Sequence, residues 1–264
     1  MPADQIDYQI LGEDLQAVVI TLDPGESVVA EAGAMMYMHE PIEMATQLSM
    51  KEGKGLFGRL FEAGKRVMTG DSFFITFFSN NGGTRADVAF SAPYPGRVIP
   101  IELAEFGGTL LCQKDCFLCG ARGVSVDIAF TKRIGAGLFG GEGFILQKIS
   151  APEGRGQAFL HAGGTVIQMN LAPGQTLKVD TGCLVAFQPS VDYDIQMVPG
   201  IRNKVFGGEG LFFVHLRGPG TVWLQTLPFS RLADRIIAAA PSHGGKGTEE
   251  GSILGGLGRM LDGN

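Results

Sequence analysis

Short apolar runs, rich in β-branched and aromatic residues, recur along the chain and are separated by Gly, Pro and Asn. They are residues 17–22 (AVVITL), 73–78 (FFITFF), 144–149 (FILQKI), 165–169 (TVIQM) and 211–216 (LFFVHL). Runs of this composition between turn residues predict β-strands. Many short strands with frequent turns predict an all-β sandwich or barrel.

The sequence also repeats itself with a fixed offset. Residues 139–146 match residues 206–213, where 206 − 139 = 67, and Cys116 matches Cys183, where 183 − 116 = 67. Two separate blocks with one offset are not expected by chance, and they indicate an internal repeat.

A third, looser copy comes first, because residues 22–28 match residues 171–177 around a Pro-Gly turn. We therefore predict three units about a pseudo-threefold axis, none of which can bury its apolar face alone. Superposing residues 99–162 on residues 166–229 should then show the same strand order. The expected boundaries are a single domain over 1–240, units over about 6–98, 99–165 and 166–228, a closing helix over 229–240 and a flexible Gly-rich tail over 241–264.

The closing helix is predicted from its end signals. Ser230 is a suitable N-cap, Leu232 and Ile236 fall on one face, and Pro241 ends the helix.

The composition narrows the function classes. A net charge of −6 argues against a general nucleic-acid binder, which needs a basic field to meet phosphates. The first ten residues show no signal peptide, no run approaches the length of a membrane-spanning helix, and four cysteines do not make a disulfide scaffold. We expect a cytoplasmic protein, with peripheral membrane association as an alternative.

Three cysteines raise the question of a metal centre. Cys112, Cys116 and Cys119 have the spacing C-x3-C-x2-C, which is similar to the iron–sulfur fingerprint of radical enzymes that use S-adenosylmethionine. The repeat places Cys183 alone at the position of Cys116, where each opens a strand after a turn. Because Cys116 and Cys119 are three apart, they should face opposite sides of that strand. The pattern therefore predicts buried small hydrophobes and no metal.

No other motif predicts catalysis. The four histidines stand far apart, no H-x-H pair of a cupin is present, and nothing resembles G-x-S-x-G, a P-loop or H-E-x-x-H. We expect no catalytic residue, no cofactor and no enzyme activity.

Two groups of residues are candidate sites. The repeat relates Asp71, Glu142 and Glu209, which either form an acidic ring or accept backbone N–H bonds in their own turns. Residues 53–68 form an apolar insertion at near-helical spacing, and five basic against two acidic residues between positions 51 and 68 give 5 − 2 = +3. This insertion is a candidate interaction surface or a cap on the barrel. Its candidate contact residues are Leu56, Phe57, Arg59, Leu60, Phe61, Lys65 and Arg66.

The Pro-Gly turn and three longer stretches carry a family resemblance: residues 179–187 (VDTGCLVAF), 206–228 (FGGEGLFFVHLRGPGTVWLQTLP) and 230–236 (SRLADRI). Over about residues 6–240, the chain resembles the altered-inheritance-of-mitochondria family, number twenty-four of that series. The resemblance implies a TRAP-like fold, similar to a double-stranded β-helix, bacterial relatives of unknown function, and mitochondrial relatives associated with inner-membrane organisation. It brings no catalytic residues.

These observations favour a non-catalytic β scaffold that binds other proteins, itself first as a homo-oligomer, through a basic and apolar pole. A membrane surface or another protein is an alternative partner. One alternative function is a ligand-binding or enzymatic β barrel with an unrecognised pocket. A second is RNA binding by analogy of fold, although nucleic acid is not expected as a partner because of the acidic charge and the single Trp223.

Overall fold

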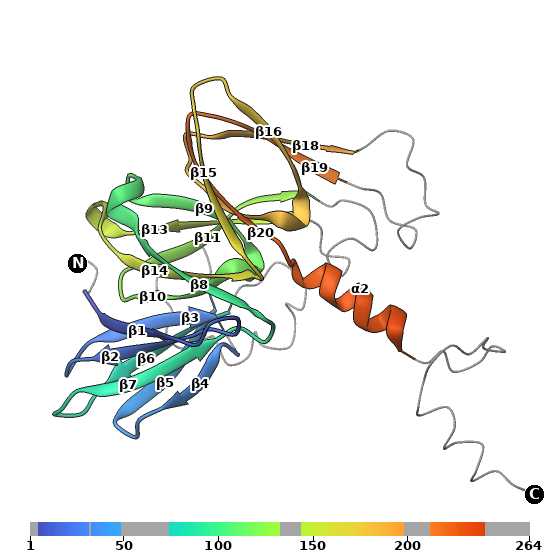
Figure 1. The fold of residues 1–264 in the computed structure, drawn as a ribbon. Helices are drawn as coiled ribbons and strands as arrows, with labels where there is room; N and C mark the ends of the chain where they lie inside the picture. The colour runs from blue at the N-terminus through green and yellow to red at the C-terminus, as the bar shows by residue number, and fades with distance from the viewer. Residues whose placement is uncertain (1–4, 32, 49–73, 133–143, 198–211, 241–264) are drawn as a thin grey trace, which may run out of the picture. The chain divides into compact units, whose positions relative to one another are not determined.

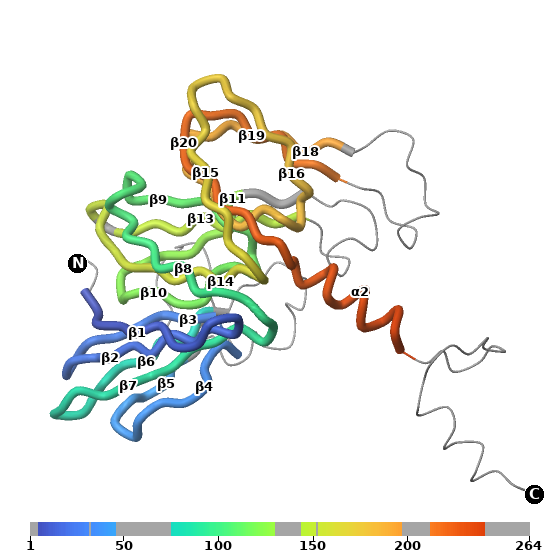
Figure 2. The backbone as a smooth tube through the Cα atoms, in the orientation of Figure 1, coloured from blue at the N-terminus to red at the C-terminus, as the bar shows by residue number. Residues whose placement is uncertain are grey.

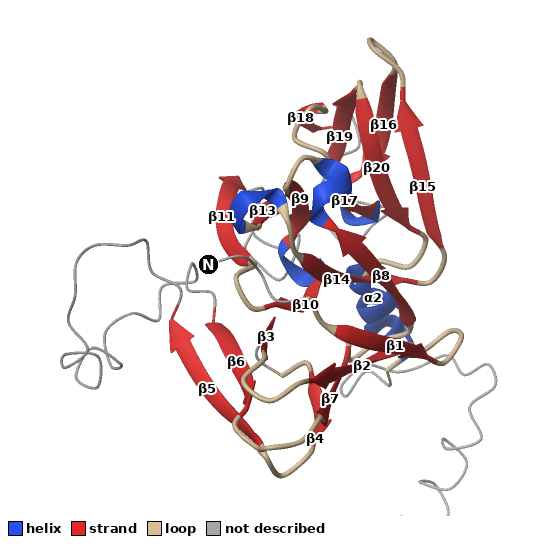
Figure 3. Ribbon diagram, turned by 90° about the vertical axis from the view of Figure 1, so that its left-hand side faces the viewer, coloured by secondary structure: helices blue, strands red, loops and turns tan. Residues whose placement is uncertain are grey.

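The computed structural model describes residues 5–31, 33–48, 74–132, 144–197 and 212–240. The chain divides into a unit of residues 1–230 and a unit of residues 231–264, and each is described by itself. Antiparallel strands make up the described part of the first unit (Figures 1 and 3). The helix α2 (Phe229–Ala239) begins at its end and continues into the second unit. The all-β class with one short C-terminal helix is therefore confirmed, whereas the expected domain boundaries stay a prediction.

After the first strand β1 (Asp7–Leu11), the strands within the described residues fall into three consecutive sets of six. Set 1 contains β2 (Ala17–Leu22), β3 (Ser27–Glu31), β4 (Met35–Met38), β5 (Ile42–Leu48), β6 (Phe74–Asn80) and β7 (Ala86–Ser91). Set 2 contains β8 (Gly96–Glu102), β9 (Thr109–Gln113), β10 (Phe117–Ala121), β11 (Ser125–Lys132), β13 (Phe144–Ser150) and β14 (Gln157–Gly163). Set 3 contains β15 (Val166–Leu171), β16 (Thr176–Asp180), β17 (Leu184–Phe187), β18 (Asp192–Met197), β19 (Phe212–Arg217) and β20 (Gly220–Gln225).

The strands pair in the same way in each set. The sixth strand lies between the first and the third, as in β2-β7-β4, β8-β14-β10 and β15-β20-β17. The fifth strand lies between the second and the fourth, as in β3-β6-β5, β9-β13-β11 and β16-β19-β18. Each set thus contributes three strands to each of two different sheets.

Neighbouring sets are joined by one kind of strand pair. The second strand of one set pairs antiparallel with the third strand of the next, as β3 with β10 and β9 with β17. These two junctions produce the two six-stranded sheets, ordered β5-β6-β3-β10-β14-β8 and β11-β13-β9-β17-β20-β15. Figure 2 shows β3 beside β10 at the first junction.

A bulge recurs in the third strand of each set. The register shifts between Met35 and Tyr37 in β4, between Phe117 and Cys119 in β10, and between Leu184 and Ala186 in β17. These positions are related by 35 + 149 = 184 and 117 + 67 = 184. A bulge inserts one residue and bends its strand, so all three strands are redirected at the same point.

The Pro-Gly turns also have the same construction in sets 1 and 3. Gly25 and Gly174 have φ of 86° and 77°, where only glycine is unstrained. The side chain after each glycine accepts a hydrogen bond from the first N–H of the turn, Glu26 from Asp23 at 2.8 Å and Gln175 from Ala172 at 2.9 Å. The sequence match between residues 22–28 and 171–177 thus corresponds to a shared hydrogen-bonding pattern.

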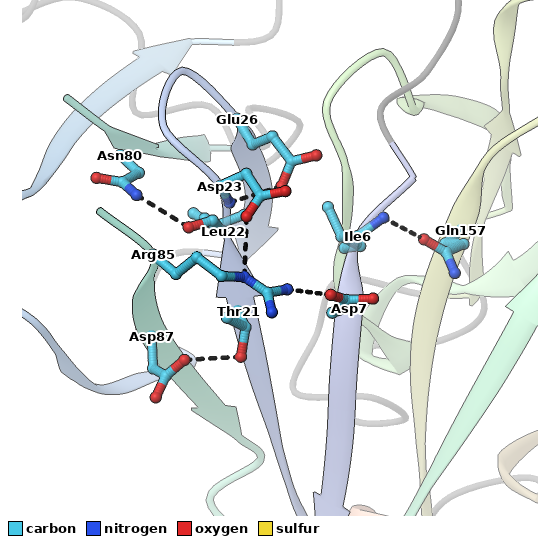
Figure 4. A network of polar contacts seen from close by, with 10 residues as sticks. All are labelled: Ile6, Asp7, Thr21, Leu22, Asp23, Glu26, Asn80, Arg85, Asp87 and Gln157. Carbon is cyan, nitrogen blue, oxygen red and sulfur yellow. Dashed lines mark hydrogen bonds and ion pairs between the residues drawn. The ribbon is translucent and has the colours of Figure 1, made fainter. Parts of the chain in front are cut away.

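A polar network ties β1 to set 1 (Figure 4). The guanidinium of Arg85 contacts the carboxylates of Asp7 in β1 and Asp23 in the turn after β2, the latter at 2.9 Å. Gln157 of set 2 accepts a hydrogen bond from the N–H of Ile6 at 2.8 Å. Both ion pairs are exposed, so they orient the strand more than they stabilise it.

The core consists of three hydrophobic clusters, to which residues from all three sets contribute. Edge-to-face or tilted aromatic pairs lie in each cluster with centroid separations of 5.1 to 5.2 Å, an arrangement that adds to area burial. The pairs are Phe78–Phe90, Phe106–Trp223 and Phe187–Tyr193. Trp223, the single tryptophan, is buried and offers no exposed ring face.

Replacing Gly174 with Ala tests the turn. A β-carbon there would meet no heavy atom within 4 Å, so the penalty is conformational and should be about 1–2 kcal/mol. Gly83 is a matched control, because its surroundings are equally open and its φ lies outside the left-handed region. Urea unfolding should show a lower free energy of unfolding for Gly174→Ala and no loss for Gly83→Ala. Equal stabilities of the two variants would contradict the account of this turn.

Candidate functional site

Both candidate groups from the sequence lie outside the described residues. Leu56, Phe57, Arg59, Leu60, Phe61, Lys65, Arg66 and Asp71 fall within 49–73, Glu142 within 133–143, and Glu209 within 198–211. These three segments follow the fourth strand of sets 1, 2 and 3, respectively. Their proposed roles therefore stay predictions.

All four cysteines are free thiols, and three of them are buried. Cys112, Cys116 and Cys119 are buried, and Cys183 is half-buried. Cys116 belongs to the second hydrophobic cluster and Cys119 to the first, so the two thiols pack into different parts of the core, as their spacing predicts. Burial raises the pKa of all three buried thiols, which keeps them protonated and unreactive. One detail differs from the expectation: Cys116 ends a 3₁₀ turn, Lys114–Cys116, and strand β10 begins one residue later.

His161 in β14 is a buried histidine without the setting of a catalytic base. Its ring packs edge to face on Tyr94 at 4.6 Å, and its Nδ1 has no hydrogen-bond partner among the described residues. Burial lowers the pKa of His161 to about 4, so the ring is neutral at physiological pH. The close approach of Gly96 to Nε2 leaves no room for a side chain beside the ring. His161 therefore acts as a packed core residue.

A cluster of ionisable groups lies near the junction between β3 and β10. Burial raises the pKa of Glu31 to about 7, an effect that Asp115 increases and Lys114 opposes. Burial is also the main cause of a raised pKa for the Tyr94 hydroxyl, to which nearby Cys116, Asp115 and Glu31 add. The side chain of Asp115 is 62% exposed, so water screens its charge. Glu31 is thus the group in this cluster whose protonation changes near neutral pH.

An open cavity of about 650 Å³ lies beside the second junction. Lys148 supplies the charged group of its lining, and Gln188 already accepts a hydrogen bond from the N–H of Thr221 at 2.7 Å. No carboxylate, histidine or cysteine lines the cavity, so it lacks a general base. The lining residues are Phe106, Gly107, Thr109, Leu111, Lys148, Gln188, Pro189 and Ser190.

The described ranges hold no metal-binding cluster and no helix that could span a membrane. No group of three or more His, Cys, Asp and Glu residues there could hold a metal ion. None of the helices in those ranges is long and apolar enough to cross a membrane.

Two strands at sheet edges lack the kind of neighbour that joins the sets elsewhere. The second and third strands of the sets pair at the two junctions, but β16 of set 3 and β4 of set 1 have no described strand on their outer sides. Figure 1 shows these two strands at opposite ends of the strand array in the first unit. We call them the β16 edge (Thr176–Asp180) and the β4 edge (Met35–Met38), the latter followed directly by His39.

The β4 edge is apolar and exposed. Met36, Tyr37 and Met38 are 57%, 45% and 36% exposed. The positions that match Met36 and Tyr37 in β10 are Leu118 and Cys119, which are only 3% and 0% exposed. An exposed apolar edge strand offers unpaired backbone groups to another strand, so it is a candidate pairing surface.

The described part of the chain is a fold of repeated antiparallel sheets, and such a fold does not by itself assign an activity. The chain belongs to the family described as mitochondrial biogenesis AIM24, whose model matches residues 8–227. The resemblance seen in the sequence is therefore confirmed.

Two relatives support this assignment. An uncharacterised protein of Streptococcus pyogenes serotype M6 is 30% identical over 226 residues, which cover 85% of this chain and 87% of that protein. The X-ray crystal structure of a Streptococcus pyogenes protein, a structural genomics target, matches with a TM-score of 0.68 and 25% identity over 89% of this chain and 100% of that chain. Neither description states an activity.

Sequence reasoning missed the two edges and the protonation of Glu31. A signal for the β4 edge was present, because set 1 has Met36-Tyr37-Met38 where set 2 has Leu118-Cys119-Gly120. Large side chains in place of small ones indicate a different neighbour at this strand.

Thiol labelling tests the burial of the cysteines. In the folded protein we expect a thiol-reactive dye to modify Cys183 and to leave the three buried thiols unmodified until denaturant is added. The variant Cys183→Ser should lose the native-state labelling. Rapid labelling of two or more thiols in the folded protein would contradict the packing described here.

The pH dependence of stability tests Glu31. Because its pKa is raised from 4.5 to about 7 in the folded protein, the folded state holds a proton that the unfolded state releases between these values. The stability contributed by protonated Glu31 is therefore lost as pH rises from about 4.5 to 7. Unfolding of Glu31→Gln, followed from pH 5 to pH 8, should lack this fall, whereas the exposed control Glu105→Gln should keep it. An equal pH slope in Glu31→Gln and the parent protein would refute the assignment.

Proposed function

We propose that this chain is a non-catalytic β scaffold that binds other proteins, itself first as a homo-oligomer, in the bacterial cytoplasm. The observation that carries the proposal is the state of its chemically capable groups. In the described residues, the buried thiols are kept protonated, His161 is kept neutral, and the cavity beside the second junction lacks a base. A scaffold needs none of these groups to react, whereas catalysis by these groups would need a thiolate, an imidazole that titrates near neutral pH or a base in the cavity.

The scaffold would meet its partner through the insertion at residues 53–68. Its apolar residues include Leu56, Phe57, Leu60 and Phe61, and basic residues surround them. Burying four such side chains contributes roughly 6–10 kcal/mol before ordering costs, more than a local charge of +3 contributes in salt. A second subunit is favoured over a lipid surface, because the whole chain carries −6 and anionic lipid repels it.

Nucleic acid is a weaker candidate partner. Single strands bind on exposed aromatic platforms and basic grooves, and Trp223 is buried between strands. Salt-sensitive micromolar RNA binding in a filter assay at low salt would contradict the proposal.

The double variant Phe57→Ser/Phe61→Ser tests the docking surface. We expect its mass by light scattering to fall relative to the parent protein, because two apolar contacts are removed. The control Phe57→Leu/Phe61→Leu keeps the apolar area and should keep the mass. Liposome pelleting of both variants tests the membrane alternative. If the insertion binds a membrane, Phe57→Ser/Phe61→Ser should lose pelleting with liposomes and keep its mass. A loss of thermal stability without a change in mass or pelleting would place these side chains in the core and refute the proposed surface.

A further inference from the structure

We propose that copies of this chain associate head to tail, with the β16 edge of one copy pairing antiparallel to the β4 edge of the next. In the register that we infer, Val179 lies opposite Tyr37, Lys178 opposite Met38, and Leu177 opposite His39. The inference rests on the proposed homo-oligomer and specifies a contact between its subunits.

The first argument is the complementarity of the two edges. Between neighbouring sets, the second strand of one set pairs with the third strand of the next, at β3–β10 and β9–β17. Among the described strands of these two kinds, β16 and β4 are the pair left without such a neighbour, and they are one strand of each kind. A second copy supplies to each edge the strand type that the fold already uses there.

The second argument is the register, which both internal junctions share. Cys119 lies opposite Ala30 at the first junction, and Ala186 lies opposite Cys112 at the second, where 119 + 67 = 186. The offset between sets 2 and 3 moves Cys112 to 112 + 67 = 179, and the offset between sets 1 and 3 moves Ala186 to 186 − 149 = 37. The pair Val179–Tyr37 follows, and the two neighbouring pairs follow from antiparallel pairing.

The third argument is burial. The strands β10 and β17, which occupy their junctions, are buried along their whole length. The corresponding strand β4 is half-buried at Met35 and exposed from Met36 to Met38. Leu177 of β16 is half-buried, whereas its counterparts Val28 and Leu110 are fully buried. The β4 edge therefore keeps exposed the apolar side chains that a neighbouring strand covers elsewhere. At the β16 edge, Leu177 is less buried than its counterparts, and Val179 is already buried in the third hydrophobic cluster.

The inferred pairs are chemically compatible. Tyr37 opposite Val179 is an aromatic pair with a β-branched residue, a favourable combination across antiparallel strands. Lys178 can lay its aliphatic stem along Met38 while its ammonium stays in water. Because two different edges meet, the contact is heterologous and builds a ring or a filament rather than a two-fold dimer.

Disulfide formation between two differently tagged, co-expressed chains tests this contact. All chains carry Cys183→Ser to remove the half-buried thiol. One chain carries Tyr37→Cys and the other Val179→Cys; a second pair carries Met38→Cys and Lys178→Cys. Adjacent antiparallel pairs alternate in geometry, so at least one of the two pairs is close enough to form a disulfide. After mild oxidation with diamide we expect a reducible heterodimer carrying both tags.

The controls define what overturns the inference. Tyr37→Cys paired with Thr176→Cys is three residues out of register, roughly 10 Å along the strand, and should give no heterodimer. A disulfide-linked dimer of Tyr37→Cys chains alone would mean a two-fold contact and would overturn the head-to-tail arrangement. An oligomeric mass by light scattering without a disulfide in either matched pair would refute this contact and leave the homo-oligomer standing. A monomeric mass of the parent protein would refute both, with the edges then covered by the chain itself.

Discussion

The antiparallel pairing of a second strand with the third strand of the next set is the interaction on which the rest of the structure depends. Without β3–β10 and β9–β17, each set would present two half-sheets with open edges and incomplete cores. The pairing joins these halves into six-stranded sheets and places residues from different sets in common hydrophobic clusters. Each of the three hydrophobic clusters takes residues from more than one set, so no set completes its core alone.

The same strand pairing explains why the thiols of Cys112 and Cys119 are buried and stay protonated. The thiol of Cys112 lies in β9 and that of Cys119 in β10, the strands that make the two junctions, so each must be small and apolar in effect. A cysteine in its thiol form satisfies this requirement, and the raised pKa is a consequence of the packing rather than a preparation for chemistry. Glu31 at the end of β3 is the exception, because burial raises the pKa of its carboxyl to about 7, so its protonation changes near neutral pH.

The open edges of β16 and β4 belong to the two strand types that pair at the internal junctions. A second copy of the chain can therefore pair there in the same way. The contact inferred for β16 and β4 adds no new kind of interaction and repeats between copies the pairing found twice within one copy. Natural sheets protect open edges with charges or bulges, and Lys178 and the bulge in β4 are features of this type. They would restrict pairing to a strand that matches the bulge, which gives specificity rather than general aggregation.

The sequence by itself determined the strand class, the 67-residue offset, the Pro-Gly turns, the start of α2 and the family, because these depend on local composition and turn chemistry. Cys116 and Cys119 do lie in different clusters, as predicted, but alternation along one strand is not the reason. Cys116 precedes β10, a bulge separates Phe117 from Cys119, and Leu118 shares the cluster of Cys119. Only the tertiary structure decided which strands meet, because β3 and β10 lie far apart in the chain and no local pattern names a partner. The exposure of Met36, Tyr37 and Met38 and the raised pKa of Glu31 were likewise decided there, because each depends on which neighbouring strand is present to exclude water.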